Sequence, residues 1–392
     1  MTANGGTTWD EDRLLDQARA ATGLGDFGDD AFREGLGRLV WSLEHEADLP
    51  DLGVAILGEI VAGSLRQRLQ IEDWYRRHPE IDDEPIREPL VGLGLPRTGS
   101  SALSALIAED PRTRSFANWQ TVDMCPPPST VPAPDPRLAL TAERQELQKQ
   151  AAPRAQALLP ITVTGPAECQ SLLQLNFASP SFAAMAPVPT YARWLLYEAD
   201  MRPTYAYERR TLKLLQWGLE PLPWRLKCPN HLLWLDAFDE VFPDARFWWT
   251  HRDPSEVLVS VADLYMEVGA MFGSTPDRVA CGAYNLEQWD LAMARGVAWR
   301  DDDHDDRFFD LEFRAVQRDP IGEVTALYRW LGQDVSSEFE SNMRQWWAEH
   351  AASRSENVHP DPAVFGLDPD ELRARFARYT ARAERWCRRD DP

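Results

Sequence analysis

Apolar and polar residues alternate with helical periodicity over the first part of the chain. Leu36, Leu39, Val40 and Leu43 fall on one face of a helix, and charged residues stand between such positions. This spacing is typical of amphipathic helices that bury one side. Residues from about 9 to 79 are therefore predicted to form a helical segment that packs on a larger domain.

Beyond residue 88 the pattern changes to short apolar runs, each followed by a loop and then a helix. Three such units succeed one another, at 88–108, 224–241 and 245–260. The third has a strong helix start, with Asp253 as the cap and Pro254 after it. Repeated strand–loop–helix units predict a parallel sheet covered by helices, and ligands of such sheets bind at the carboxyl ends of the strands.

The first loop has the composition of a phosphate-binding turn. Gly94 and Gly99 have the spacing of the GxxxxGK[ST] loop of nucleoside triphosphatases, and Ser101 occupies its hydroxyl position. Ser100, however, stands where that loop has its lysine, and the only nearby cation is Arg97. A kinase or triphosphatase without this lysine loses a main contact to the transferred phosphoryl group. The turn therefore predicts a cradle for a different phosphate ester, built from backbone N–H groups and a helix N-terminus.

These units give the expected organisation of the chain. Residues 1–87 form a helical N-terminal extension packed on the core, and residues 88–392 form one α/β domain. That domain is predicted to be P-loop-like, with three layers in which helices flank a central parallel sheet. It carries an insertion at about 120–222 and ends in charged helices, from about 319 to 347 and from 369 to 389.

Charge and cysteine content exclude several classes of partner. A formal net charge of −22 argues against general affinity for nucleic acid or for an anionic membrane. The five cysteines are odd in number and widely spaced, which predicts neither a disulfide framework nor a zinc site. A reducing cytoplasm is the expected location, since the sequence has no secretory leader and no run of about 18 apolar residues. Self-association into a homo-oligomer stays open.

Further candidate residues stand at the other two strand ends and in the insertion. Arg252 precedes the capped helix and Ser260 lies further along it on the same face, so both side chains can converge on one anion. Lys227 ends the second strand. His231 follows near a helix N-terminus, which favours a neutral imidazole, and its alternative role is that of a core or capping histidine. Glu168, in a GPAE turn, is a second candidate base or a helix cap.

Four motifs together resemble the sulfotransferase family that uses 3′-phosphoadenosine 5′-phosphosulfate (PAPS) as donor, in particular its bacterial members. They are PRTGSS at 96–101, KCPNH at 227–231, FPDA at 242–245 and HRDP at 251–254. The resemblance spans most of residues 88–380, and it implies that the loop holds the 5′-phosphosulfate while an arginine–serine pair holds the 3′-phosphate. The donor-binding set that it implies is Arg97, Thr98, Gly99, Ser100, Ser101, Arg252 and Ser260.

Sulfuryl transfer sets the roles expected of the catalytic residues. The sulfuryl group bears less negative charge than a phosphoryl group, so no metal is expected. Charge grows on the departing 5′-phosphate, where Arg97, Lys227 and the loop 98–101 can stabilise it. The acceptor, a hydroxyl or amine of a small molecule, must lose a proton to a base. Glu168 resembles the acceptor-side carboxylate of many bacterial members. His231 is the alternative, although it stands four residues after Lys227 rather than the two seen in cytosolic aryl sulfotransferases.

Two other functions fit parts of this pattern. One is a nucleotide kinase or triphosphatase that uses the same cradle and requires magnesium, and the missing loop lysine speaks against it. The other is a non-catalytic nucleotide-binding protein of the same fold. The retention of Arg97, Lys227, Arg252 and Ser260 beside two potential bases speaks against that second function. The sequence predicts an enzyme and does not name its acceptor.

Overall fold

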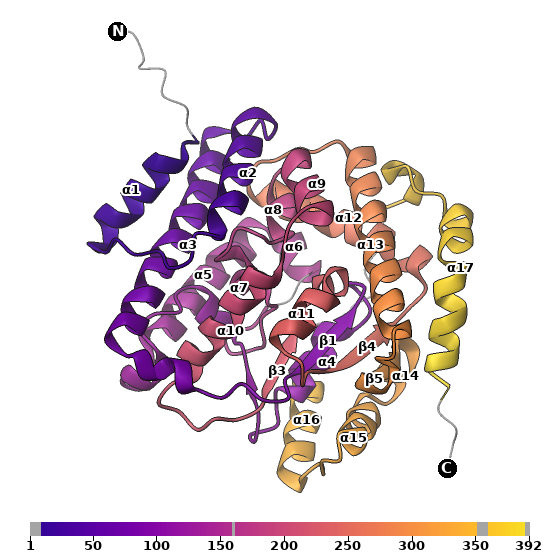
Figure 1. The fold of residues 1–392 in the computed structure, drawn as a ribbon. Helices are drawn as coiled ribbons and strands as arrows, with labels where there is room; N and C mark the ends of the chain where they lie inside the picture. Colours follow the sequence, from indigo (N-terminus) through magenta and orange to yellow (C-terminus); the bar gives the residue numbers. More distant parts are fainter. Residues whose placement is uncertain (1–8, 159–160, 351–359, 389–392) are drawn as a thin grey trace.

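The sheet at the centre of the molecule is parallel throughout. The computed structural model describes residues 9–158, 161–350 and 360–388 (Figure 1). Within these residues five strands form one sheet in the order β2-β3-β1-β4-β5. They are β1 (Leu90–Gly94), β2 (Arg114–Ser115), β3 (Trp224–Lys227), β4 (Arg246–His251) and β5 (Phe308–Glu312). The predicted central parallel sheet is confirmed, and its middle strand is the one that precedes the Gly-containing loop.

The register of the strands brings their carboxyl ends to one edge of the sheet. Gly92 of β1 lies opposite Lys227 at the end of β3, and Gly94 lies opposite Thr250 near the end of β4. Strands β4 and β5 end in register with each other. The loops that follow these strands therefore begin side by side, which is the arrangement that places ligands in open α/β sheets.

Helices cover both faces of the sheet, so the domain has three layers. Leu90, Trp248 and Leu311 join a hydrophobic cluster on one face, whereas their alternate neighbours Val91 and Phe247 belong to the larger cluster on the other. The first cluster includes α4 (Ser100–Ile107), α14 (Phe313–Arg318), α15 (Pro320–Trp330) and α16 (Ser337–Glu349). The larger cluster includes α11 (Leu235–Val241), α12 (Pro254–Met271), α13 (Arg278–Asp301) and α17 (Pro369–Trp386).

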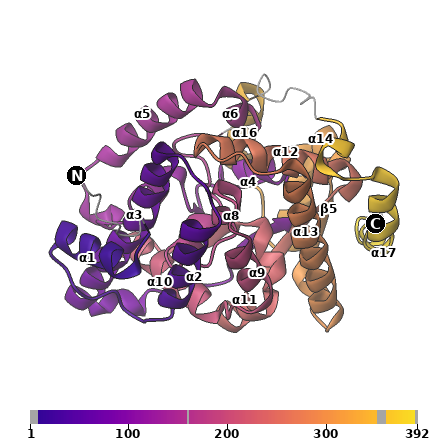
Figure 2. The same ribbon diagram turned by 90° about the horizontal axis from the view of Figure 1, so that it is seen from above.

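The N-terminal segment is helical, as the periodicity predicts. It consists of α1 (Glu11–Thr22), α2 (Phe32–His45) and α3 (Asp51–Arg77), which lie on the opposite side of the molecule from α17 (Figure 2). Arg68 of α3 is fully buried and donates hydrogen bonds to the carbonyl of Phe27 at 2.9 Å and to Oδ1 of Asn176 at 2.8 Å. These bonds join the N-terminal helices to the segment between β2 and β3.

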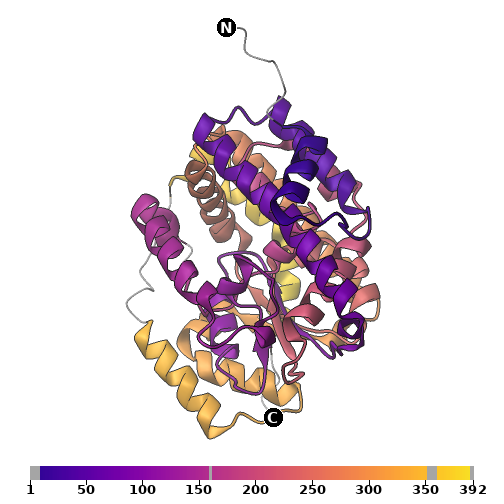
Figure 3. The same cartoon turned by 90° about the vertical axis from the view of Figure 1, so that its left-hand side faces the viewer.

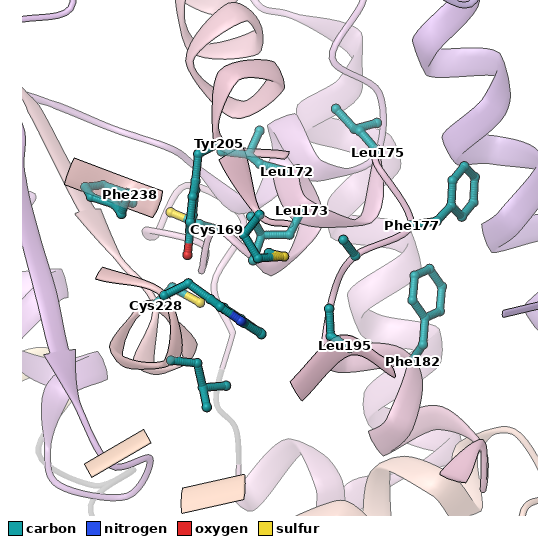
Figure 4. Packing of buried hydrophobic residues seen from close by; sticks show 14 of the residues in the cluster. Cys169, Leu172, Leu173, Leu175, Phe177, Phe182, Leu195, Tyr205, Cys228 and Phe238 are labelled. Atoms are coloured by element: carbon teal, nitrogen blue, oxygen red, sulfur yellow. The ribbon is translucent and has the colours of Figure 1, made fainter. Parts of the chain in front are cut away.

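The segment between β2 and β3 is built from short helices. They are α5 (Pro136–Ala151), α6 (Pro153–Leu158), α7 (Gln170–Gln174), α8 (Ser181–Met185), α9 (Pro189–Tyr197) and α10 (Arg202–Gln216). Phe177 and Phe182 pack against each other in its interior (Figure 4) with their ring centres 6.4 Å apart, and Tyr191 is fully buried beside them. These aromatic residues fill the core of the segment.

Two parts of the domain differ from the sequence pattern. The helix expected up to residue 241 is split, because η4 (Pro229–Leu233) is a 3₁₀ turn and α11 begins only at Leu235. Strands β2 and β5 were not predicted at all. The first has two residues, and the second follows an acidic run and itself contains Asp310 and Glu312. Neither shows the apolar run that marks the three central strands.

The remaining short elements are 3₁₀ turns in the connections. They are η1 (Pro79–Asp83), η2 (Asn118–Thr121), η3 (Pro128–Thr130), η5 (Asp305–Arg307) and η7 (Pro362–Phe365). The side view shows α3 running along the outside of the molecule, with α16 at the lower end of the view (Figure 3). Among the helices in the described ranges, none combines the length and the apolarity needed to cross a membrane.

Candidate active site

The loop after β1 is held in shape by its own side chains. The Thr98 hydroxyl donates to the carbonyl of Leu95 at 2.7 Å and lies 2.6 Å from the Thr250 hydroxyl on β4. Gly99 has a φ of 81° and forms the N-cap of α4, a conformation that strains residues with a Cβ. No side chain in the described chain caps α4. Its first amide N–H groups are therefore available to an anion, so the cradle fits a phosphate ester.

Arg97, Arg252 and Ser260 meet beside this loop. Nε of Arg97 donates to Oγ of Ser260 at 3.1 Å, and the Arg252 guanidinium donates to the Arg97 carbonyl at 3.1 Å. Arg97 also donates to the carbonyl of Leu158. Burial, and then the positive charge of Arg252, lower the pKa of the Arg97 guanidinium. An anion bound between the two arginines would offset both effects, so Arg97, Arg252 and Ser260 form a cationic centre beside the loop.

Arg252 is oriented by the start of α12 and by an aromatic ring. Asp253 caps α12 by accepting the N–H of Ser255 at 2.9 Å. The Arg252 guanidinium carbon lies 4.4 Å from the centre of the Phe313 ring, and its Nε donates to Glu256 at 3.2 Å. A cavity of about 260 Å³ borders Arg252 and Phe313 and extends to α17. The site thus offers an aromatic wall next to its cationic centre.

A buried ionic network supports β4 immediately before Arg252. Nε2 of His251 contacts Asp310 of β5 at 2.7 Å, and Nδ1 of His251 contacts the Tyr379 hydroxyl at 2.9 Å. Arg300 of α13 donates two hydrogen bonds to Asp310, at 2.7 and 2.8 Å. Burial alone would raise the pKa of Asp310, but the hydrogen bonds from His251 and Arg300 hold it below its ordinary value.

We expect Asp310→Asn to destabilise the fold by about 3–5 kcal/mol at neutral pH, because it removes the buried carboxylate that pairs with Arg300. The lowered pKa of Asp310 sets the pH dependence. Its contribution is fully present above the unfolded pKa of about 3.9 and disappears as the pH falls through the lower folded pKa. Chemical denaturation from pH 3 to 8 measures the free energy of unfolding of both proteins. The difference between wild type and variant should become smaller only at acidic pH. Asp305→Asn is the matched control, because Asp305 pairs with the same arginine but its side chain is 69% exposed, and it should cost less than about 1 kcal/mol.

Lys227 connects the loop after β1 to the segment between β2 and β3. Its ammonium group donates to Oγ of Ser101 at 3.3 Å and to the carboxylate of Glu168. The side chain of Lys227 is 5% exposed and that of Glu168 is 32% exposed, so the carboxylate is the member of the pair that solvent reaches. The backbone N–H of Cys169 donates to the carbonyl of Lys227 at 3.2 Å and fixes the approach of the two segments. The pair joins a candidate phosphate contact to a candidate base.

His231 lies in the core. Its side chain is fully buried in η4, and its Nδ1 lies 3.1 Å from the Tyr205 hydroxyl. Burial lowers the pKa of His231 to about 3, so the imidazole is neutral. The described contacts of its ring are with Tyr205 and Phe238, whereas Glu168 contacts Lys227 directly. His231 is thus enclosed in the core, whereas Glu168 is partly exposed beside Lys227.

Two residues of the site were not singled out by the sequence. Thr250 supports the loop through Thr98, and Phe313 packs on Arg252. Thr250 is the last residue of a predicted strand and directly precedes the motif that contains Arg252. Its place at a strand end could therefore have marked it as a site residue. Phe313 directly follows β5, which the sequence pattern did not reveal, so nothing marked it.

The parallel sheet and the Gly-containing loop between β1 and α4 define an α/β fold of the P-loop type. The sulfotransferase family matches residues 89–337 of the chain. The chain therefore belongs to the sulfotransferase family and is a transferase. This family membership speaks against the kinase and the non-catalytic alternatives.

Two solved structures resemble nearly the whole chain. Sulfotransferase STF9 from Mycobacterium avium has a TM-score of 0.87 at 30% sequence identity, covering 97% of this chain and 98% of that one. Sulfotransferase STF1 from Mycobacterium tuberculosis H37Rv has a TM-score of 0.79 at 28% identity, covering 95% of this chain and 100% of that one. Comparison with curated proteins gave no match.

Proposed function

We propose that this sulfotransferase moves a sulfuryl group from PAPS to a hydroxyl or amine of a small-molecule acceptor. The observation that carries the proposal is the position of Lys227, whose ammonium group contacts Ser101 in the phosphate loop and Glu168 on the other side. A group transferred between a donor in the loop and an acceptor beside Glu168 passes this ammonium group.

The cationic centre supports a donor with two separate phosphate positions. The loop and the first turn of α4 suit the 5′-phosphosulfate, and Arg252 with Ser260 suits the 3′-phosphate. Arg97 lies between them, since it belongs to the loop and contacts Ser260. The whole chain carries a net charge of −22, so these local cations must supply the attraction for a polyanionic substrate.

Lys227 and Glu168 have distinct tasks in the transfer. PAPS supplies an activated sulfuryl group, and breaking its bond to the 5′-phosphate leaves negative charge on that phosphate. The Lys227 ammonium can stabilise this charge by a charge-assisted hydrogen bond. Glu168 can accept the proton that the acceptor hydroxyl or amine loses. Because the sulfuryl group repels a nucleophile less than a phosphoryl group does, the step has no need of a metal ion.

The acceptor is proposed to approach Glu168 from the segment between β2 and β3. The acceptor would not contact the aromatic side chains of Phe177, Phe182 and Tyr191, because all three are buried in the core of that segment. We place the enzyme in the cytoplasm, and four buried cysteine thiols that form no disulfide support this location.

Calorimetric titration with 3′-phosphoadenosine 5′-phosphate (PAP), the donor without its sulfuryl group, tests the donor assignment. Binding without magnesium that ATP does not match is expected. Arg97→Ala and Arg252→Ala should each weaken PAP binding by roughly 10- to 100-fold, because each removes a charge-assisted contact of about 1.5–3 kcal/mol. Arg19→Ala, on the outer helix α1, is the control and should bind PAP normally. If both site variants bind PAP with wild-type affinity, the assignment of the two phosphate positions is wrong. If the protein prefers magnesium ATP to PAP, the assignment of PAPS as the donor is wrong.

A further inference from the structure

Three potential metal ligands meet in the core behind Glu168. Cys169 stands at the start of α7, Glu208 on α10 and His231 on η4, and each of the three is 0% exposed. One ligand atom from each lies within 4.8 Å of the others. Figure 4 shows Cys169 and Cys228 in the same part of the core as Tyr205, which is one turn before Glu208. Three elements that are distant in sequence thus place sulfur, oxygen and nitrogen donors around one point.

The polar atoms of this cluster lack partners. The thiol of Cys169 approaches the Glu208 carboxyl group. Apart from that weak donor, both carboxyl oxygens of Glu208 and Nε2 of His231 have no hydrogen-bond partner within the described chain. A buried polar atom without a partner costs about 1–3 kcal/mol. Three such atoms in one small volume indicate that a ligand satisfies them together.

We propose that Cys169, Glu208 and Nε2 of His231 bind one zinc ion. Thiolate, imidazole and carboxylate are the ligands that zinc takes in proteins, whereas magnesium and calcium prefer oxygen alone. Zinc bonds of about 2.0–2.3 Å put neighbouring donors of a tetrahedron roughly 3.3–3.7 Å apart, so side-chain rotations suffice to close separations of up to 4.8 Å. These residues supply three of the four donors, and a water molecule would complete the tetrahedron.

The charges of such a site balance. Zinc replaces one proton on the Cys169 thiol and one on the Glu208 carboxyl, and its two positive charges are matched by the thiolate and the carboxylate. Without the metal the buried thiol and carboxyl keep those two protons, because an unpaired charge is unfavourable in the core. The contact of His231 with Tyr205 through Nδ1 leaves Nε2 to the metal.

The ion would have a structural role. Its three protein ligands are fully buried, so a substrate would not reach the ion. The backbone N–H of Cys169 donates a hydrogen bond to the carbonyl of Lys227, and Glu168 directly precedes Cys169. Zinc would therefore tie α7, α10 and η4 together behind the pair of Glu168 and Lys227.

Metal analysis of the purified full chain tests the proposal. The protein is produced without a histidine tag in zinc-supplemented medium, and its metal content is measured by mass spectrometry after gel filtration. About one zinc per chain is expected for the wild type, since a closed site of this kind retains its metal. Cys169→Ser and Glu208→Gln should lose the zinc, and Cys281→Ser, which changes a buried thiol of α13, should keep it. Wild-type protein without stoichiometric zinc, or full zinc content in Cys169→Ser, would overturn the proposal.

A second measurement needs no variant that might misfold. Wild-type protein produced in cobalt-supplemented medium should show the near-ultraviolet charge-transfer absorption of a cobalt–thiolate bond and the visible bands of tetrahedral cobalt. Removing the metal with a chelator should lower the melting temperature, and Zn²⁺ alone should restore it. A spectrum without the thiolate band, or a melting temperature that a chelator and Zn²⁺ leave unchanged, would exclude the site. Both readouts are independent of sulfuryl transfer.

Discussion

Glu168→Gln is expected to lower the rate of sulfuryl transfer by about 10²- to 10⁴-fold, the range that a positioned general base contributes. Glutamine keeps the size of the side chain and a hydrogen-bonding oxygen, but it does not accept the acceptor's proton at neutral pH. Affinity for PAP should stay within a few-fold, because the donor-binding residues lie on other loops. Initial rates at saturating donor, together with calorimetry of PAP, measure the two quantities separately.

The matched control for this substitution is Glu240→Gln. Glu240 is an exposed carboxylate at the end of α11, with a side chain 61% exposed, and its loss should change neither quantity. A Glu168→Gln enzyme that keeps wild-type turnover would show that the base lies elsewhere. Loss of PAP binding together with turnover would instead show that Glu168 matters for the shape of the donor site.

Lys227→Met is expected to lower turnover by about 10²- to 10³-fold, because the departing 5′-phosphate loses the charged donor aimed at it. Methionine preserves most of the apolar stem, which suits a side chain that is 5% exposed at the end of a central strand. Single-turnover measurements of sulfuryl transfer give the rate of the chemical step. Lys213→Met on α10 removes a lysine whose ammonium group bonds the Asp82 carbonyl, far from the loop in sequence, and should leave turnover unchanged.

The double variant makes the Lys227 prediction more stringent. Glu168 and Lys227 are in direct contact, so their effects on turnover should not add. The double variant should be much less impaired than the product of the two single losses. Strict multiplication of the two effects would mean that the residues act independently, and turnover near the wild-type value in Lys227→Met would remove the lysine from the transfer step.

The parts of the site that depend on local chain geometry were predictable from the sequence. The cradle follows from two glycines and a helix start, and the convergence of Arg252 and Ser260 follows from the periodicity of a single helix. The central parallel sheet follows from repeated strand–loop–helix units. In the first two cases the residues concerned lie within a few positions of one another, so the local backbone geometry brings them together. The strands of the sheet are far apart in sequence, but each strand–loop–helix unit is itself local.

The parts that depend on packing between distant segments were not predictable. Glu168 and Lys227 are 59 positions apart, and nothing in the sequence indicates that one pairs with the other. His231 was placed near a helix N-terminus, but its surroundings are set by Tyr205 and Phe238 from two other helices. The cysteine and histidine spacing likewise gave no metal site, because the three ligands proposed above come from α7, α10 and η4. Strand β5 was missed because its five residues include two acids.

The cationic centre and the surroundings of Glu168 come from different stretches of the chain. The loop after β1 and the start of α12 hold the cationic centre, whereas Glu168 and the helices around it come from the stretch between β2 and β3. Under the proposed function, substitutions within that stretch would alter which molecule is sulfated, while the residues proposed to bind the nucleotide stay the same. A change of acceptor would therefore require substitutions in only about a quarter of the chain, in one contiguous stretch.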